Sequence, residues 1–238
     1  MQPLRNQQIL LTGASGGIGN ALARLLHSSG ARVFITGKNP DKLSQCGKEA
    51  GIRPEMQFAA DLSNNQEVQQ LKQHFFEQCT QIDTLINLAG TGIIHPIEQL
   101  TESDLDRSLK DNLYSAFHLM QAFLPEMKKT GTGLIIHTPG ILGKVPMAGA
   151  AAYCASKYAL VGFIQSIREE LKRSAIRITQ VYLGGTDSAF WDTIDLKVQR
   201  DKMVRAEEAA KAIWFLCQQP DSGVINELVL QPFNHQAI

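Results

Sequence analysis

A glycine-rich turn between an apolar segment and a helical segment most constrains how this chain can fold. The turn follows the apolar residues 9–11, and Gly13, Gly17 and Gly19 give it a Gly-x-x-x-Gly-x-Gly spacing. A strand that turns sharply into a helix needs a residue that tolerates positive φ, and glycines also let a phosphate approach the backbone. The helix expected over residues 20–29 would point its unpaired N–H groups and its positive dipole end at that phosphate. We therefore predict a turn that binds a dinucleotide pyrophosphate, with a glycine turn that binds no ligand as the alternative.

Apolar segments alternate with segments of helical period along the rest of the chain. Further strands are expected at residues 32–36, 56–60, 84–88, 133–138, 176–183 and 224–230. Helices are expected at residues 42–50, 65–79, 101–128, 150–174 and 206–218. Residues 184–204 have no clear period and are expected to form a long loop. This alternation predicts an α/β fold in which helices cover both faces of a parallel sheet. The sequence contains no repeat or linker that would divide residues 1–238 into more than one domain.

The balanced composition argues against several classes of function. With 23 basic and 23 acidic residues, the formal net charge is zero, which argues against general binding of nucleic acid or of anionic membranes. The N-terminal segment is too polar for a secretion signal, and no apolar segment is long enough to span a bilayer. The four cysteines lack metal-binding or redox spacing and are expected to be free thiols. We therefore expect a cytoplasmic protein that acts on a small molecule and binds no metal.

The end of the second expected strand bears on the choice between NAD and NADP. In dinucleotide-binding folds, an acidic residue roughly 20 positions past the glycines bonds the ribose hydroxyls and favours NAD. Here Gly37 leaves room for a 2′-phosphate and Lys38 supplies a positive charge, so NADP(H) is favoured over NAD(H). The alternative for Lys38 is a solvated loop lysine. Asp61, after the third strand, either accepts a hydrogen bond from the adenine amino group or caps the next helix.

Tyr153 and Lys157 are four residues apart in an expected helix, so they lie one turn apart on the same face. An ammonium group beside a phenol stabilises the phenolate and lowers the phenol pKa from its ordinary value of about 10. A tyrosine in this environment can give a proton to a carbonyl oxygen or take one from an alcohol. The alternative is an ordinary pair on a helix surface.

Four features together resemble the classical subfamily of the short-chain dehydrogenases/reductases. They are the glycine turn at residues 12–19, the segment Asn87-Leu88-Ala89-Gly90, Asn112 within a long helix, and the pair of Tyr153 and Lys157. The resemblance covers nearly the whole chain. It implies a single Rossmann-type, doubly wound domain with seven parallel strands and a nicotinamide dinucleotide as cofactor, and it specifies the substrate poorly.

The same resemblance implies roles for individual residues. Tyr153 would be the acid/base, Lys157 would hold the nicotinamide ribose, and Asn112 would fix a backbone kink and a water in a proton relay. Cofactor contacts are implied for Gly13, Ser15, Gly17, Ile18, Gly19, Lys38, Asp61, Leu62, Asn87, Ala89, Gly90, Tyr153, Lys157, Gly184 and Thr186. Family oligomers often pair two long helices, which implies a homodimer or homotetramer through residues 101–128 and 150–174.

One departure from the family pattern concerns catalysis. The family places a catalytic serine thirteen residues before the tyrosine, and this chain has Gly140 there. Losing one such donor typically costs on the order of 10²–10³ in rate. Thr138, or Ser188 on the facing loop, is a candidate replacement donor. Alternatively, the substrate needs only the tyrosine, or the protein binds NADP(H) without turnover as a sensor or structural partner. We expect catalysis because the other residues of the pattern are retained.

Residues 184–204 are expected to form a loop over the substrate. The loop contains Phe190 and Trp191, which favours an apolar or aromatic carbonyl compound, such as a 3-oxoacyl compound or another ketone or aldehyde. The alternative is that these side chains dock the loop on the body or on a partner subunit. Expected substrate contacts are Thr138, Gly140, Ser188, Phe190 and Trp191. His95 and His137 are expected near the pocket rim without a role as acids or metal ligands.

Overall fold

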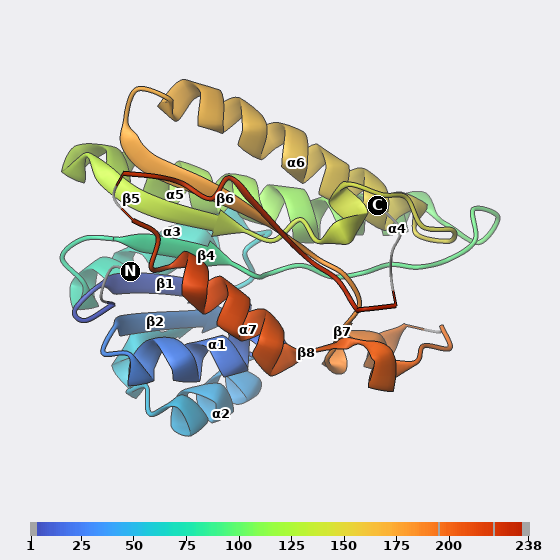
Figure 1. Ribbon diagram of the computed structural model, residues 1–238, viewed down its shortest axis with the longest axis horizontal. Helices are drawn as coiled ribbons and strands as arrows, with labels where there is room; N and C mark the ends of the chain where they lie inside the picture. The colour runs from blue at the N-terminus through green and yellow to red at the C-terminus, as the bar shows by residue number, and fades with distance from the viewer. Residues whose placement is uncertain (1–3, 195, 221, 235–238) are drawn as a thin grey trace.

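The computed structural model describes residues 4–194, 196–220 and 222–234, which form a sheet with helices on both faces (Figure 1). Seven parallel strands form the sheet in the order β3-β2-β1-β4-β5-β6-β9. The strands are β1 (Gln8–Thr12), β2 (Arg32–Gly37), β3 (Gln57–Ala59), β4 (Thr84–Asn87), β5 (Thr132–His137), β6 (Ala175–Leu183) and β9 (Glu227–Leu230). This arrangement confirms the expected seven-stranded, doubly wound Rossmann-type fold.

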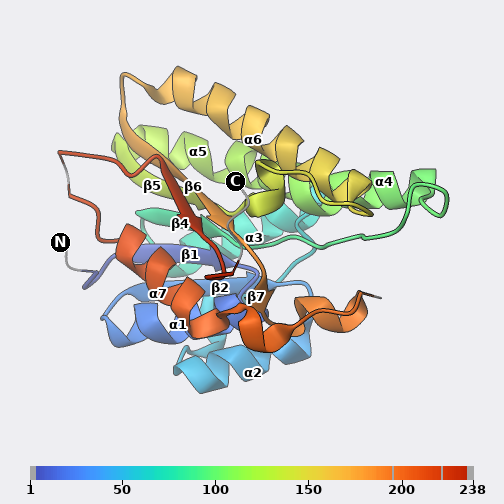
Figure 2. The ribbon, with the colours of Figure 1, turned by 45° about the vertical axis from the view of Figure 1, so that its right-hand side comes forward.

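Two groups of helices cover the two faces of the sheet (Figure 2). One group contains α1 (Gly17–Ser28), α2 (Pro40–Ala50) and α7 (Ala206–Leu216). The other group contains α3 (Asn65–Gln78), α4 (Glu102–Leu109), α5 (Ser115–Thr130) and α6 (Ala151–Leu171). Within the part of the chain that the structure describes, no helix is long and apolar enough to cross a membrane.

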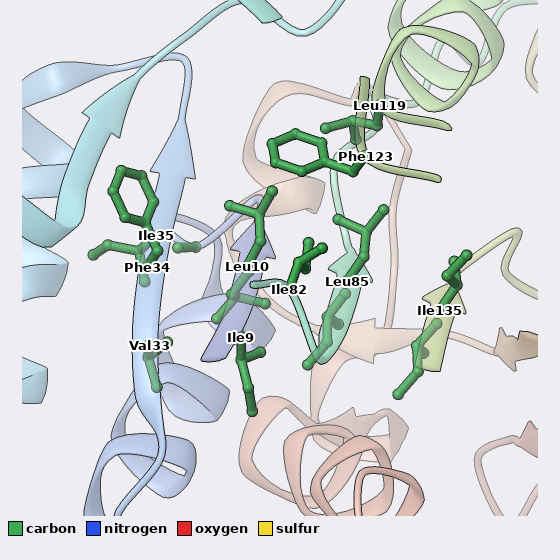
Figure 3. Packing of buried hydrophobic residues seen from close by; sticks show 14 of the residues in the cluster. Ile9, Leu10, Val33, Phe34, Ile35, Ile82, Leu85, Leu119, Phe123 and Ile135 are labelled. Atoms are coloured by element: carbon green, nitrogen blue, oxygen red, sulfur yellow. The ribbon is translucent and has the colours of Figure 1, made fainter. Parts of the chain in front are cut away.

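The central strands are apolar because both faces of the sheet are covered. Ile9, Leu10 and Leu11 of β1 are completely buried although successive side chains point to opposite faces. Figure 3 shows Leu119 and Phe123 of α5 beside the side chains of the central strands, with which they form one hydrophobic cluster. The core therefore holds the carboxyl ends of neighbouring strands at one edge of the sheet.

Residues next to two helix starts make capping contacts. Before α2, the Asn39 side chain accepts a hydrogen bond from the Lys42 N–H at 2.9 Å, and Pro40 occupies the first helical turn. Before α4, the Thr101 hydroxyl accepts from the Asp104 N–H while the Asp104 carboxylate accepts from the Thr101 N–H. Local sequence therefore supplies the caps of both helices, although α2 begins at Pro40, two residues before its expected start.

The helix expected over residues 101–128 is not a continuous α-helix. A π-helical turn at Lys110–Tyr114 separates α4 from α5. The Asn112 side chain in this turn donates to the carbonyl oxygens of Ser108 and Thr91, each at 2.9 Å, and accepts from the Thr91 N–H at 3.2 Å. These contacts bind the turn to a residue 21 positions earlier in the chain. The local hydrophobic pattern therefore predicted one continuous helix, whereas the family resemblance implied a backbone kink at Asn112.

The segment expected to be a long loop, residues 184–204, contains regular structure. Near its two ends, β7 (Thr186–Asp187) and β8 (Val204–Arg205) pair as a second, two-stranded parallel sheet. Two 3₁₀ turns lie between these strands, at Ala189–Thr193 and Arg200–Lys202. The pairing joins the ends of the segment, which projects beside the start of α1 (Figure 1). Elements of two to five residues are too short to produce a period in the sequence.

Candidate functional site

A cleft of about 1150 Å³ lies at the carboxyl ends of the central strands. The order of the strands reverses direction between β1 and β4, and ligands of open α/β sheets bind at such a switch point. The expected site residues in the cleft wall are Gly13, Ser15, Gly17, Ile18, Gly19, Lys38, Gly90, Thr138, Gly140, Tyr153, Lys157, Gly184, Thr186, Ser188, Phe190 and Trp191. Asp61, Leu62, Asn87, Ala89 and Asn112 do not line it.

The glycine turn has a physical requirement for glycine at two of its positions. Gly13 has a φ of +67°, and a Cβ there would lie 2.8 Å from the backbone carbon of Leu88. A Cβ on Gly19 would lie 2.2 Å from the carbonyl oxygen of Gly13. The first residue of α1 is Gly17, and no side chain caps the helix at Gly16. The first N–H groups of α1 are therefore not occupied by a side-chain cap and face the cleft that the turn lines.

Tyr153 and Lys157 line one part of the cleft, and the Asn112 side chain lies behind its wall at Gly90. The Lys157 Nζ lies 5.5 Å from the centroid of the Tyr153 ring and donates to the carbonyl oxygen of Thr138 at 3.2 Å. A Cβ on Gly90 would lie 2.5 Å from the Asn112 Oδ1 and 3.1 Å from the Lys157 Nζ. The π-helical turn and the start of α6 therefore bring polar side chains from two separate parts of the chain to the backbone of Gly90.

Burial sets the protonation of Tyr153 and Lys157 in the ligand-free protein. Burial lowers the pKa of Lys157 to about 8. The expected lowering of the Tyr153 pKa is wrong for this state, because burial raises the pKa of the phenol. The free-energy cost of burying the Tyr153 phenolate away from water is larger than its attraction to the Lys157 ammonium. Tyr153 is therefore protonated at neutral pH, which is the form that can donate a proton.

The backbone of Gly140 has a conformation that a serine would rarely adopt. Its φ of +70° lies in a region that residues with a side chain rarely adopt. Space is not the constraint, since a Cβ there would have only the carbonyl oxygen of Leu183 nearby, at 3.6 Å. The turn after β5 is thus built for glycine at this position.

Neither expected replacement for the serine hydroxyl has the geometry that we predicted. The Thr138 hydroxyl donates to the carbonyl oxygen of Asn87 at 2.8 Å, so its proton is directed at the backbone. Ser188 lies over the glycine turn, because a Cβ added to Gly17 would be 3.1 Å from the Cβ of Ser188. The Ser188 hydroxyl accepts a hydrogen bond from the Phe190 N–H. The sequence spacing placed both hydroxyls in the cleft wall but could not orient them.

Lys38 and Asp61 form an ion pair that the sequence analysis did not predict. The Lys38 Nζ lies 2.6 Å from the Asp61 Oδ2, and this hydrogen bond raises the pKa of Lys38. The Asp61 Oδ1 accepts from the N–H and the hydroxyl of Ser63. Although burial opposes the effect, the hydrogen bonds from Lys38 and Ser63 lower the pKa of Asp61. The capping interpretation of Asp61 is wrong, because Asn64 is the N-cap of α3.

The sequence analysis missed residues at both ends of the cleft. Lys42 of α2 and Arg107 of α4 line it, and the Arg107 charge is close enough to Lys38 to act on its pKa. Apolar residues outside the expected substrate loop that were not predicted to line the cleft are Ile94, Leu142, Val145, Pro146 and Met147. These residues come from separate segments, and no local spacing relates them.

The two histidines expected near the pocket rim do not line the cleft. His137 is completely buried, with its ring between the side chains of Asn87 and Met120. Burial, together with the nearby charge of Lys157, lowers the pKa of His137 to about 3. His137 is therefore a neutral residue of the core, and its expected place at the rim is wrong. Among the described residues, no group of three or more acidic, histidine or cysteine side chains is arranged to hold a metal ion.

The fold and the cleft define a Rossmann-type nucleotide-binding protein. The model of the family described as short chain dehydrogenase matches residues 7–199. This chain therefore belongs to the short-chain dehydrogenase family, whose members are oxidoreductases.

Individual relatives cover nearly the whole chain. Nodulation protein G from Rhizobium meliloti (strain 1021) is 34% identical over 238 residues, which are 96% of this chain and 96% of that protein. A metagenomic short-chain oxidoreductase solved in complex with NADP is 29% identical, with a TM-score of 0.82 over 97% of this chain and 99% of that chain. An alcohol dehydrogenase from the archaeon Thermococcus sibiricus, solved with 5-hydroxy-NADP, has a TM-score of 0.87 at 23% identity and covers 98% of this chain and 100% of its own. That last likeness shows the fold alone.

We expect that Gly140→Ser will strain the turn after β5 and destabilise the protein, so it will not simply restore the missing hydroxyl. The substitution places a side chain at a φ of +70° and should lower the free energy of unfolding by about 1–3 kcal/mol. Urea unfolding measures this loss, and Gly140→Ala is the matched control with the same backbone strain and no hydroxyl. A serine variant as stable as the parent would contradict the conformational argument.

Proposed function

We propose that this protein is an NADP(H)-dependent oxidoreductase for a carbonyl or alcohol substrate, with Tyr153 as the acid/base. One observation carries the proposal: the glycine turn and the pair of Tyr153 and Lys157 line the same cleft. The bound coenzyme would supply or accept the hydride at the substrate carbon. Membership of the short-chain dehydrogenase family supports this class of reaction.

The cleft fits a nicotinamide dinucleotide. Close backbone packing at Gly13 and Gly19 and the uncapped start of α1 suit a pyrophosphate. Lys38, Lys42 and Arg107 provide positive charge for a 2′-phosphate. The 29% identical oxidoreductase that was solved with NADP supports the same cofactor for this chain. We therefore favour NADP(H) over NAD(H).

Tyr153 is suited to donate a proton during carbonyl reduction. Its raised pKa keeps the phenol protonated, and the proton passes to the substrate oxygen while the carbonyl carbon receives the hydride. The Lys157 ammonium, held by the carbonyl oxygen of Thr138, then stabilises the phenolate that forms. Asn112 supports this arrangement from behind Gly90. Alcohol oxidation requires the phenolate first, so the same environment favours reduction.

The substrate end of the cleft favours an apolar or aromatic carbonyl compound. The ring of Phe190 lies 6.0 Å from that of Tyr153, and Trp191 contacts Phe190 edge to face at 5.1 Å. The Trp191 Nε1 donates to the carbonyl oxygen of Thr186, so the indole is held by its own segment where that segment lines the cleft. A 3-oxoacyl compound or another ketone or aldehyde fits these walls. Gly140 offers no hydroxyl, which leaves Tyr153 as the proposed donor to the substrate oxygen.

A second candidate function is coenzyme binding without meaningful turnover, as a sensor or structural partner. The conformation of Gly140 is the observation that favours it, because the positive φ in the turn after β5 disfavours the usual serine.

The four cysteines, Cys46, Cys79, Cys154 and Cys217, are free. This is the state expected in a reducing compartment and supports a cytoplasmic location for either function.

A panel of ketones, aldehydes and 3-oxoacyl compounds should contain a substrate that oxidises NADPH in the presence of this protein. Tyr153→Phe should lower turnover by a factor of about 10²–10⁴, because it removes the proton donor and little else. NADPH absorbance measures the rate, and coenzyme titration checks that the variant still binds. Equal turnover by Tyr153→Phe would exclude Tyr153 as the acid/base, and binding without any turnover would favour the second function.

Lys38→Ala should weaken NADPH binding about tenfold and leave NADH binding unchanged, because only NADPH carries the 2′-phosphate. The expected loss is moderate because Lys38 must leave Asp61 to meet the phosphate. Isothermal titration with each nucleotide measures the effect, and Lys48→Ala, an exposed lysine of α2 outside the cleft, is the matched control. Tighter binding of NADH than of NADPH by the parent protein would contradict the assignment.

We also propose a homodimer or homotetramer through the helices that include residues 101–128 and 150–174. Tyr114, Phe117 and Tyr158 belong to these helices and have exposed fractions of 47%, 38% and 45%. The Phe117 ring contacts that of Phe163, with 6.0 Å between centroids, so the exposed aromatic surface continues from α5 to α6. Large exposed apolar surfaces of this kind favour association.

Phe117→Glu should therefore separate the subunits that pair through α5 and α6, because it places a charge in an apolar interface. Sedimentation velocity measures the change in mass. Phe215→Glu is the matched control, since Phe215 is a comparably exposed phenylalanine on α7, on the opposite face of the sheet. A Phe117→Glu protein with the same mass as the parent would exclude this interface.

A further inference from the structure

The short turn Leu88–Gly90 lies between the two parts of the candidate site. On one side, a Cβ on Gly13 would lie 2.8 Å from the backbone carbon of Leu88. On the other side, a Cβ on Gly90 would lie within 3.1 Å of both the Asn112 Oδ1 and the Lys157 Nζ. A shift of this turn by a few tenths of an ångström therefore moves the glycine turn, the acid/base pair or both.

Asn87 holds this turn through a side chain that has only one workable orientation. Its Oδ1 accepts from the Ala89 N–H at 3.2 Å and from the Thr12 hydroxyl at 2.7 Å. The Ala89 N–H can only donate, so the amide oxygen must face it and the amide nitrogen must face the other way. The Asn87 Nδ2 then lies 3.2 Å from the Nδ1 of His137, the neighbouring residue on β5.

This geometry determines which ring nitrogen of His137 carries the proton. Because the Asn87 Nδ2 donates, the His137 Nδ1 must accept, and the proton lies on Nε2, 3.5 Å from the Sδ of Met120. An imidazolium would place two donors opposite each other in a region without solvent. Lys157 is the charged group whose field acts on His137, and it also disfavours a second proton.

We propose that His137 is a positioning residue for the coenzyme site. As the neutral Nε2–H tautomer, it accepts from Asn87 and fixes the amide orientation that holds the Leu88–Gly90 turn against the glycine turn and Lys157. The part of this inference that concerns binding rests on the proposed coenzyme. The part that concerns the tautomer and the turn rests on the contacts alone.

Two variants distinguish the effect of losing the hydrogen-bond acceptor of His137 from the effect of losing part of its ring. In His137→Asn, the Oδ1 occupies the place of Nδ1, so the acceptor for Asn87 is kept. In His137→Leu, a methyl group occupies that place, so the acceptor is lost. Both variants lose the half of the ring that contacts Met120. The difference between the two variants therefore reports the hydrogen bond and not the cavity.

His137→Leu should weaken NADPH binding about tenfold, and His137→Asn should bind within about threefold of the parent. Fluorescence titration measures binding, and thermal unfolding measures the stability that both variants lose. A structural role alone would lower the stability of both variants and leave both binding constants at the value of the parent. That result, or equal weakening by both variants, would overturn the proposal.

Two measurements on the ligand-free protein keep this test independent of the proposed function. The ¹⁵N chemical shifts of the His137 ring should report a bare Nδ1 and a protonated Nε2. Hydrogen exchange at the Ala89 amide should be faster in His137→Leu than in the parent or in His137→Asn, because that amide donates to Asn87. A protonated Nδ1, or equal Ala89 exchange in all three proteins, would overturn the positioning role. Failure of the parent to bind NADPH, with the expected tautomer and exchange, would instead count against the coenzyme alone.

Discussion

The close contact between the backbone of Gly13 and that of Leu88 is the constraint on which the rest of the site depends. It joins the end of β1 to the end of β4 at the position where the strand order changes direction. A side chain at Gly13 would separate these two segments, and its positive φ would be strained. The glycine turn is thus required by packing within the protein, and its fit to a phosphate is an additional property of the same geometry.

Burial shifts the pKa values of the two groups of the proposed acid/base pair in opposite directions. It favours the neutral forms of both Tyr153 and Lys157, because each charged form loses its hydration. A neutral phenol is ready to donate a proton, whereas a lysine with a pKa near 8 is still largely protonated at neutral pH. In the proposed reduction, the phenol would donate its proton to the substrate, and the phenolate would form only as that proton leaves.

The turn after β5 shows how this chain departs from the pattern that it resembles. Gly140 stands where that pattern has a serine, and its φ is +70°. In the same region, the Thr138 hydroxyl is directed at the backbone of Asn87, and the neighbouring His137 is directed into the core. The surroundings of Asn87 are thus rich in hydrogen bonds, while the substrate side of the turn offers no hydroxyl at position 140. Under the proposed function, this arrangement leaves Tyr153 as the donor to a substrate oxygen.

The sequence by itself determined the features that depend on neighbouring residues. The alternation of apolar and helical segments predicted the parallel sheet, and a four-residue spacing placed Tyr153 and Lys157 on one face of a helix. Only the tertiary structure decided features that join distant segments or depend on burial. The contact of Asn112 with Thr91, the ion pair of Lys38 with Asp61, the place of His137 in the core and the pKa of Tyr153 are of this kind. Spacing places side chains on a face, but their partners and their hydration are determined by whichever segments the fold packs against them.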